Sequence, residues 1–124
     1  MDLAKHPPRE AYIEGFLTGQ LVAYCEQIRL GSRLAGTINC DRAYVEKLLP
    51  IAAQEGCRTE VMAIDNDRVC LWIYKYEFLR RVIGAVESKH AESDLGMWAM
   101  GKLFGYADSD IAKYINEHSS EETT

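Results

Sequence analysis

The strongest secondary-structure signal in the chain is the stretch of residues 59–74, TEVMAIDNDRVCLWIY. Residues 59–64 and 69–74 are rich in β-branched and aromatic side chains, which are typical of strands, and the polar residues 65–68 form a turn between them. The second run is apolar at both alternating sets of positions, which indicates a central strand that is buried on both faces. The sequence therefore predicts a hairpin whose second strand lies inside an antiparallel sheet.

A helix is predicted immediately before this hairpin, because apolar residues recur at helical spacing between residues 43 and 52. Asp41 is a suitable N-cap, since its carboxylate can accept a hydrogen bond from a free backbone N–H. Pro50 should kink or break this helix, because its ring clashes with the preceding turn and it has no N–H to donate. Gly56 is expected to end the element in the left-handed conformation.

Three further helices are predicted after the hairpin. They cover residues 78–86, residues 95–103 with a stop at Gly105, and a short last segment that Asp108 caps. We therefore expect a single domain with four parts: an extended N-terminus (1–9), an α+β core (10–86), a C-terminal helical part (87–117) and a disordered tail (118–124).

The segment between residue 10 and residue 39 allows two interpretations. In one, a single helix continues through residue 28 to a stop at Gly31. In the other, the helix ends near Gly19, and residues 21–30 and 33–39 form a second hairpin. We favour the interpretation with the second hairpin. The expected fold is then α+β: a small antiparallel sheet of two hairpins in αββαββα order, packed on helices and followed by two short C-terminal helices.

The composition is that of an ordinary globular domain, with 124 residues of which 48% are apolar and 27% are charged. The formal net charge is −5 and lies entirely in residues 87–124, because residues 1–86 hold eleven acids and eleven bases. The acidic total disfavours non-specific binding of nucleic acid. It still allows a local anion site in the first two-thirds of the chain.

No apolar stretch approaches the ~20 residues that cross a bilayer, so no membrane contact is expected. The first residues lack the apolar core of a secretion signal. The cysteines form no CxxC motif and are expected to be reduced, buried thiols that bind no metal. Together these features predict a cytoplasmic protein without a cofactor; the four cysteines are Cys25, Cys40, Cys57 and Cys70.

Arginines interleaved with aromatic residues form the main candidate binding site. Guanidinium groups bind phosphate through paired hydrogen bonds, and aromatic rings stack on bases. The alternative is that the rings belong to the core and the arginines to a solvated rim. The candidate ligand-binding residues are Tyr24, Arg29, Arg33, Trp72, Tyr74, Arg80 and Arg81.

Candidate catalytic groups gather only at His90, Glu92 and Asp94. In a helix, His90 and Asp94 would share a face while Glu92 would point away. A solvated linker in which Ser93 or Asp94 caps the next helix explains the cluster more simply. No Ser/His/Asp set has suggestive spacing, so we assign no catalytic or metal-binding residue and expect no enzyme.

Gly15 and Gly19 lie four residues apart in the first helix, beside Phe16. Each glycine costs about 1 kcal/mol in a helix relative to alanine, and close packing of two helix backbones is the expected compensation. That packing could occur within the chain or between subunits. We expect a homo-oligomer with Gly15, Phe16 and Gly19 at its interface.

Residues 12–19, YIEGFLTG, resemble the motif helix of the LAGLIDADG homing-endonuclease family. With two hairpins, residues 10–86 would also follow that family's αββαββα order. The resemblance implies a metal-binding carboxylate at the base of the motif helix, where this chain has Thr18 and Gln20. It therefore implies a fold that binds without cleaving.

Residues 101–106, GKLFGY, and the residues after them look like the ends of small phage and prophage proteins. Some of those proteins antagonise bacterial defence, either by blocking a protein or by sequestering a nucleotide signal. The resemblance implies a protein that acts by binding.

These features predict a non-catalytic binding protein of the kind that phages or other mobile elements carry. Its ligand would be a nucleotide or a nucleic acid, and its role would be to sequester a defence signal. One alternative is a metal-dependent nuclease that uses the cluster around Glu92. The other is an inhibitor that binds a host protein through an acidic surface formed by Glu87, Glu92, Asp94, Asp108 and Asp110.

Overall fold

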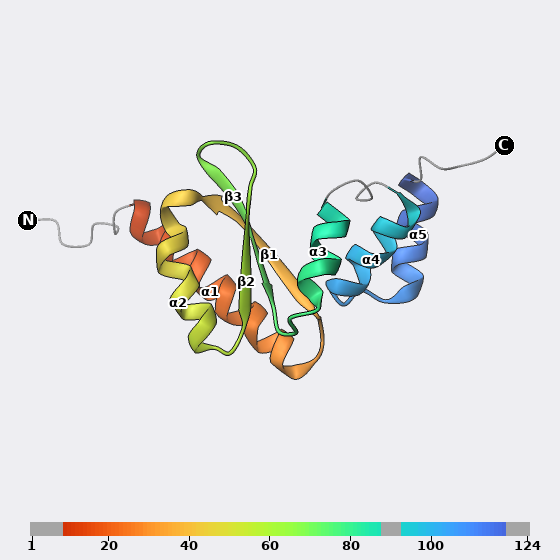
Figure 1. The fold of residues 1–124 in the computed structure, drawn as a ribbon, viewed down its shortest axis with the longest axis horizontal. Coiled ribbons are helices and arrows are strands. Elements are labelled where there is room, and N and C mark those ends of the chain that lie inside the picture. The colour runs from red at the N-terminus through yellow and green to blue at the C-terminus, as the bar shows by residue number, and fades with distance from the viewer. Residues whose placement is uncertain (1–8, 88–92, 119–124) are drawn as a thin grey trace, which may run out of the picture.

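The computed structural model describes residues 9–87 and 93–118, and within them five α-helices pack around a three-stranded antiparallel sheet (Figure 1). The predicted α+β class is confirmed. In chain order the elements are α1 (Arg9–Leu30), β1 (Ala35–Asp41), the 3₁₀ turn η1 (Arg42–Tyr44), α2 (Val45–Gln54), β2 (Arg58–Ala63), β3 (Arg68–Tyr74), α3 (Leu79–Glu87), α4 (Asp94–Leu103) and α5 (Asp108–His118).

The strand order is β1–β3–β2, so β3 is the central strand and pairs with both of its neighbours. Leu71 of β3 lies opposite Ile38 of β1 and Val61 of β2. The predicted 59–74 hairpin and its central second strand are both confirmed. Residues 71–74 are all buried, because helices cover both faces of this strand.

One face of the sheet packs on α1 and α2 (Figure 1). From α1, Leu17, Leu21, Cys25 and Ile28 recur every three or four residues and form one buried stripe. They meet the alternate side chains of the central strand, of which Leu71 is fully buried. This cluster is the larger part of the core.

The other face of the sheet packs on α3 and α4 (Figure 1). Trp72 is fully buried there, and its ring stacks on that of Phe104 with the centroids 5.6 Å apart. The backbone N–H of Leu34 donates to the carbonyl of Leu103 over 2.9 Å. These contacts attach the end of α4 to the sheet and thereby hold the α4–α5 pair against the rest of the molecule.

Of the two interpretations of residues 10–39, the single helix that stops at Gly31 is confirmed, and the second hairpin over residues 21–30 and 33–39, which we favoured, is wrong. Residues 21–30 continue α1, which ends at Leu30 and is followed by Gly31 with a φ of 86°. The helix forms because its buried stripe packs on the sheet. Only the strand after Gly31 exists, as β1, so residues 9–87 have an αβαββα order.

The predictions around α2 are confirmed in part. Asp41 precedes the turn η1 and makes no side-chain capping bond, and the helix that follows passes through Pro50 without a break. Gly56 has the predicted positive φ, of 84°. Its N–H donates to the carbonyl of Ala53, and the N–H of residue 57 donates to that of residue 52, so both of these carbonyls in the last turn of the helix have partners.

The ends of α4 also follow the sequence prediction. The Ser93 hydroxyl accepts a hydrogen bond from the N–H of Gly96 over 3.0 Å, and Gly105 ends the segment with a φ of 82°. Apart from Arg9 and His118, which belong to α1 and α5, the predicted extended N-terminus and disordered tail lie outside the described residues. Among the helices that the structure describes, none is long and apolar enough to span a membrane.

Candidate binding site

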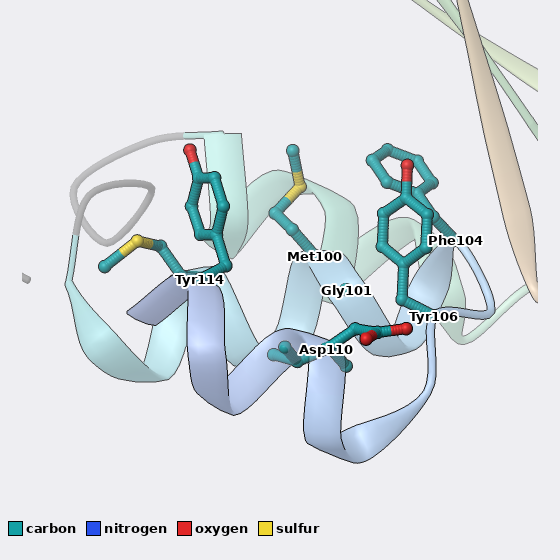
Figure 2. A pocket seen from close by; sticks show the side chains of 8 residues that line it. Met100, Gly101, Phe104, Tyr106, Asp110 and Tyr114 are labelled. Atoms are coloured by element: carbon teal, nitrogen blue, oxygen red, sulfur yellow. The ribbon is translucent and has the colours of Figure 1, made fainter. Parts of the chain in front are cut away.

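A cavity of about 520 Å³ opens between α4 and α5, and Figure 2 shows it at close range. Its walls are mainly apolar and include two methionines and three aromatic rings. Tyr106 and Tyr114 are 58% and 53% exposed, so these rings form the rim of the cavity. The lining residues are Met97, Met100, Gly101, Phe104, Tyr106, Asp110, Ile111 and Tyr114.

The cavity exists because α4 and α5 approach each other closely at one point. A Cβ on Gly101 would lie 2.6 Å from Cγ1 of Ile111, a distance that real side chains do not tolerate. Gly105 then turns the chain, and a Cβ there would collide with the carbonyl oxygen of Ser32. The larger side chains on either side of this crossing, Met100 and Tyr114 among them, leave the space between the helices open.

The aromatic lining is held in place by contacts between rings. The ring of Tyr106 meets that of Phe104 edge-on, with an interplanar angle of 81° and centroids 6.4 Å apart. Tyr114 stacks on His118 with the centroids 4.0 Å apart. In Figure 2, Tyr106 and Phe104 lie on one side of the cavity and Tyr114 on the other, with Met100 between them. These rings therefore offer a ligand two separate aromatic walls.

Among the described residues that line the cavity, Asp110 alone is charged. The nearby Asp108 is paired with Lys102, whose Nζ lies 2.6 Å from its carboxylate. Within the described residues, no ion pair or hydrogen bond engages the Asp110 side chain. The cavity thus combines apolar walls with one uncompensated carboxylate.

Nothing in the described residues forms a catalytic or metal-binding set. They contain no group of three His, Cys, Asp or Glu side chains that could hold a metal ion. His90 and Glu92 lie outside the described residues, and Asp94 is the first residue of α4.

Of the predicted ligand-binding residues, Tyr24 and Arg33 come together. The guanidinium carbon of Arg33 lies 4.6 Å from the centroid of the Tyr24 ring and 6.0 Å from that of Phe104. Gly36 makes this possible, because a Cβ there would lie 2.9 Å from Cγ of Tyr24. Arg33 makes no ion pair within the described part of the chain.

Trp72 and Tyr74 belong to the core between the sheet and α3–α4, where both are at most 2% exposed. The indole Nε1 of Trp72 is buried and has no hydrogen-bond partner among the residues that the structure describes. Burial raises the pKa of Tyr74, and the carboxylates of Glu60 and Glu77 raise it further. Neither ring is available to stack on a ligand.

The remaining arginines lie at other places and mostly pair with acids. Arg29, at the end of α1, lies 2.6 Å from a carboxylate oxygen of Glu55. Arg80 bridges to Glu60 over 3.2 Å and to Glu77 over 3.8 Å. Arg81 is exposed and, with Arg80, lines a second cavity of about 400 Å³ near the start of α3. The seven predicted residues therefore do not converge on one site.

Gly15, Phe16 and Gly19 lie on the exposed side of α1, where Phe16 is 72% exposed. A Cβ on either glycine would meet nothing within 4 Å. Close packing within the chain, one of the two explanations for these glycines, is therefore absent from the described residues. A contact between subunits stays a prediction.

The acidic residues of the second alternative are spread over three helix ends. Glu87 ends α3, Asp94 begins α4, and Asp108 and Asp110 lie in the first turn of α5. Glu92 lies outside the described residues. Of this set, Asp110 alone lines the cavity.

Most of the cavity lining was missed from the sequence. Its signal was present in Met97, Met100 and Phe104, which recur at helical spacing, and in the exposed tyrosines that follow Gly105. The same spacing is typical of an ordinary core helix, so it could not distinguish a cavity wall from a core face.

No protein-family model matches the chain, and no curated protein matches its sequence. The LAGLIDADG and phage-protein resemblances stay predictions.

Proposed function

We propose that the protein is a non-catalytic binding protein whose α4–α5 cavity holds a side chain of a partner protein. The observation that carries the proposal is the lining itself: methionine, phenylalanine and tyrosine around a single carboxylate. Aromatic residues and methionine are enriched at the centres of protein interfaces, where a few buried anchors supply most of the binding energy. Flexible methionines also adapt their shape to different anchors.

The net charge of the C-terminal part of the chain favours a basic partner. Residues 87–124 hold eight acids against three lysines. Complementary charge speeds the encounter with a basic surface and disfavours acidic partners. The proposal corresponds to the protein-binding inhibitor among the sequence predictions, and it keeps the predicted setting of a phage or mobile-element protein in the cytoplasm.

A nucleotide is the second candidate ligand, and one observation favours it. Arg33 has no acidic partner in the described part of the chain, and its guanidinium lies beside two aromatic rings, Tyr24 and Phe104. A phosphate could bind that guanidinium while a base stacks nearby. None of the described residues that line the α4–α5 cavity is positively charged, so a phosphate would bind outside it.

Titration of the isotope-labelled full chain with short peptides tests the proposal. The peptides are acetyl-Ser-Gly-X-Gly-Ser-amide, with X as Leu, Phe, Met, Lys, Arg or Gly. We expect at least one X other than Gly to cause saturable NMR shifts at the methyl groups of Met97, Met100 and Ile111. If no X differs from Gly, or if the shifts centre elsewhere, the cavity is not an anchor site.

Two tyrosine variants provide the matched comparison, because Tyr114 and Tyr12 are 53% and 54% exposed. Tyr114→Ala removes one wall of the cavity and should weaken the peptide binding at least threefold. Tyr12→Ala makes the same change on α1 and should leave it unaltered. A nucleoside triphosphate that shifts Tyr24 and Arg33, and loses this effect in Arg33→Gln, would select the second candidate instead.

A further inference from the structure

The lining of the α4–α5 cavity also indicates the chemistry of its occupant. We infer that the side chain it takes is that of arginine, an inference that rests on the proposed function. It depends on three features of the lining: its charge, its rings and its apolar floor.

The charge on the lining disfavours an apolar occupant. Asp110 has no ionic or hydrogen-bond partner within the described residues, while Lys102 is already paired with Asp108. Asp110 is itself exposed, so a purely apolar side chain in the cavity would remove part of the water around its carboxylate and put no polar group in its place, which is unfavourable. A cationic group would replace the lost water with an ion pair.

The rings favour a cation as well. The rings of Phe104 and Tyr106 stand nearly perpendicular to each other, at 81°, and Tyr114 lies on the other side of the cavity in Figure 2. Aromatic faces carry partial negative charge and attract cations, most strongly where water is excluded. Aromatic rings on two sides of the cavity and a carboxylate on its lining are groups that bind an organic cation.

Arginine fits this arrangement better than lysine does. Its guanidinium is flat, stacks on rings, loses water more easily than an ammonium group and binds a carboxylate through two parallel N–H donors. Its three methylene groups would lie along Met97, Met100 and Ile111. In the described residues, arginine also makes the shortest cation–ring contact: Arg33 lies 4.6 Å from Tyr24, compared with 5.5 Å for Lys75 over Tyr76.

Comparison of three peptides on the intact protein tests the inference. In acetyl-Ser-Gly-X-Gly-Ser-amide, we expect X = Arg to bind at least threefold more tightly than Lys and at least fivefold more tightly than Leu, as measured by NMR titration. Leu or Lys binding as well as Arg would overturn the inference while leaving the proposed anchor site standing. Failure of all peptides to bind would overturn the proposed function itself.

Variants at Asp110 distinguish recognition of the cation by the carboxylate from non-specific binding of peptides. Asp110→Asn should lower the affinity for the arginine peptide about fivefold and change the affinity for the leucine peptide by less than twofold. Glu117→Gln changes an exposed acid of the same helix outside the lining and should alter neither. An equal loss for both peptides in Asp110→Asn would show that the carboxylate does not recognise the cation.

If Asp110→Asn unfolds α5, the salt dependence of peptide binding to the wild-type protein still tests the inference. The ratio of arginine to leucine affinity should fall at least twofold between 20 and 300 mM NaCl, because salt screens only the charged contact. A ratio that stays constant would contradict the inference.

Discussion

Single residues in this fold are constrained by what their side chains meet, and two helical glycines illustrate the range. A Cβ on Gly101 of α4 would lie 2.6 Å and 2.7 Å from Cγ1 and Cδ1 of Ile111, whereas one on Gly84 of α3 would meet nothing within 4 Å. Ile111 is β-branched and therefore stiff, so it cannot easily move aside. The first glycine sets the distance between two helices, and the second only weakens its own helix.

Opposite changes in stability should follow from replacing these two glycines. Gly101→Ala should lower the free energy of unfolding by about 1–3 kcal/mol through overpacking. Gly84→Ala should raise it by about 0.5–1 kcal/mol, because alanine is the better helix former and the site has room. Urea unfolding of both variants measures the two changes. A Gly101→Ala protein as stable as the wild type would contradict the close crossing of α4 and α5.

Buried thiols should make the protein less stable in alkaline solution. Burial, reinforced by the thiol of Cys57, raises the pKa of Cys25 to about 12, and burial raises that of Cys70 to about 11. The unfolded chain releases these protons near the ordinary pKa of 9. Ionisation of the thiols therefore favours unfolding only above that pH. Stability is therefore complete below pH 9 and falls as the pH rises toward 11 and 12.

At pH 10, each of these thiols should lower the free energy of unfolding by about 1.4 kcal/mol relative to pH 7.5. The measurement is urea unfolding at both pH values. In Cys25→Ala, the free energy of unfolding should differ less between pH 7.5 and pH 10, by about that amount, whatever the variant's own stability. An unchanged difference would mean that Cys25 is not protected in the folded protein.

Among the helices and strands, α2 carries the clearest internal defect. Pro50 lies inside the helix and is exposed, so its missing N–H removes one helical hydrogen bond without a packing benefit. Pro50→Ala should restore that bond and raise the free energy of unfolding by about 1–2 kcal/mol, after the greater freedom of the unfolded chain is subtracted. Thermal unfolding measures the gain.

A control in the same helix is Gln54→Ala, which should change stability by less than about 0.5 kcal/mol. If Pro50→Ala lowers the melting temperature, the proline must fix a bend in α2 that the rest of the fold requires.

The elements that could be predicted from the sequence are those whose residue propensities and turn signals lie within the element itself. The hairpin over residues 59–74 was correct because its strand propensity and its turn lie next to each other. After Gly19 the sequence allowed both a helix and a hairpin, because apolar residues occur on the exposed side of α1 as well as on its buried side; Phe16 is 72% and Leu30 77% exposed. Only contact with the sheet shows which side is the core.

The binding residues were harder to predict for the same reason. The sequence cannot tell whether an aromatic ring faces a helix or the solvent, and Trp72 faces α3 and α4. The cavity depends on the crossing of α4 and α5 at Gly101 and Ile111, a tertiary contact without a local signature. Asp110 was predicted, as part of the acidic surface, because its charge is visible in the sequence.

Across the whole molecule, the two proposed contact surfaces lie on opposite sides of the sheet. In Figure 1, α1 and α2 cover one face, while α4 and α5 lie beyond the other. A subunit contact through α1 would therefore leave the cavity between α4 and α5 open to a partner. The protein could associate with itself and bind a ligand at the same time.

Self-association through α1 can be tested with Phe16. This side chain is 72% exposed beside two glycines that have open space around them. The helix is 22 residues long, or ~33 Å, which gives a second copy enough length for a stable helix pair. Light scattering after size exclusion should give the wild type a mass above the 14.0 kDa of one chain.

Phe16→Asp should return the mass to that of one chain, because a carboxylate at the contact would have to lose its water without a partner. Leu95→Asp is the matched control: Leu95 is 74% exposed on α4, and its replacement should leave the mass of the wild type unchanged. If the wild type has the mass of one chain at concentrations from 10 to about 200 µM, a range that covers ordinary specific dimers, the α1 surface is not a subunit contact. In that case the two glycines weaken the helix by about 1 kcal/mol each without compensation, and Gly19→Ala should stabilise the monomer.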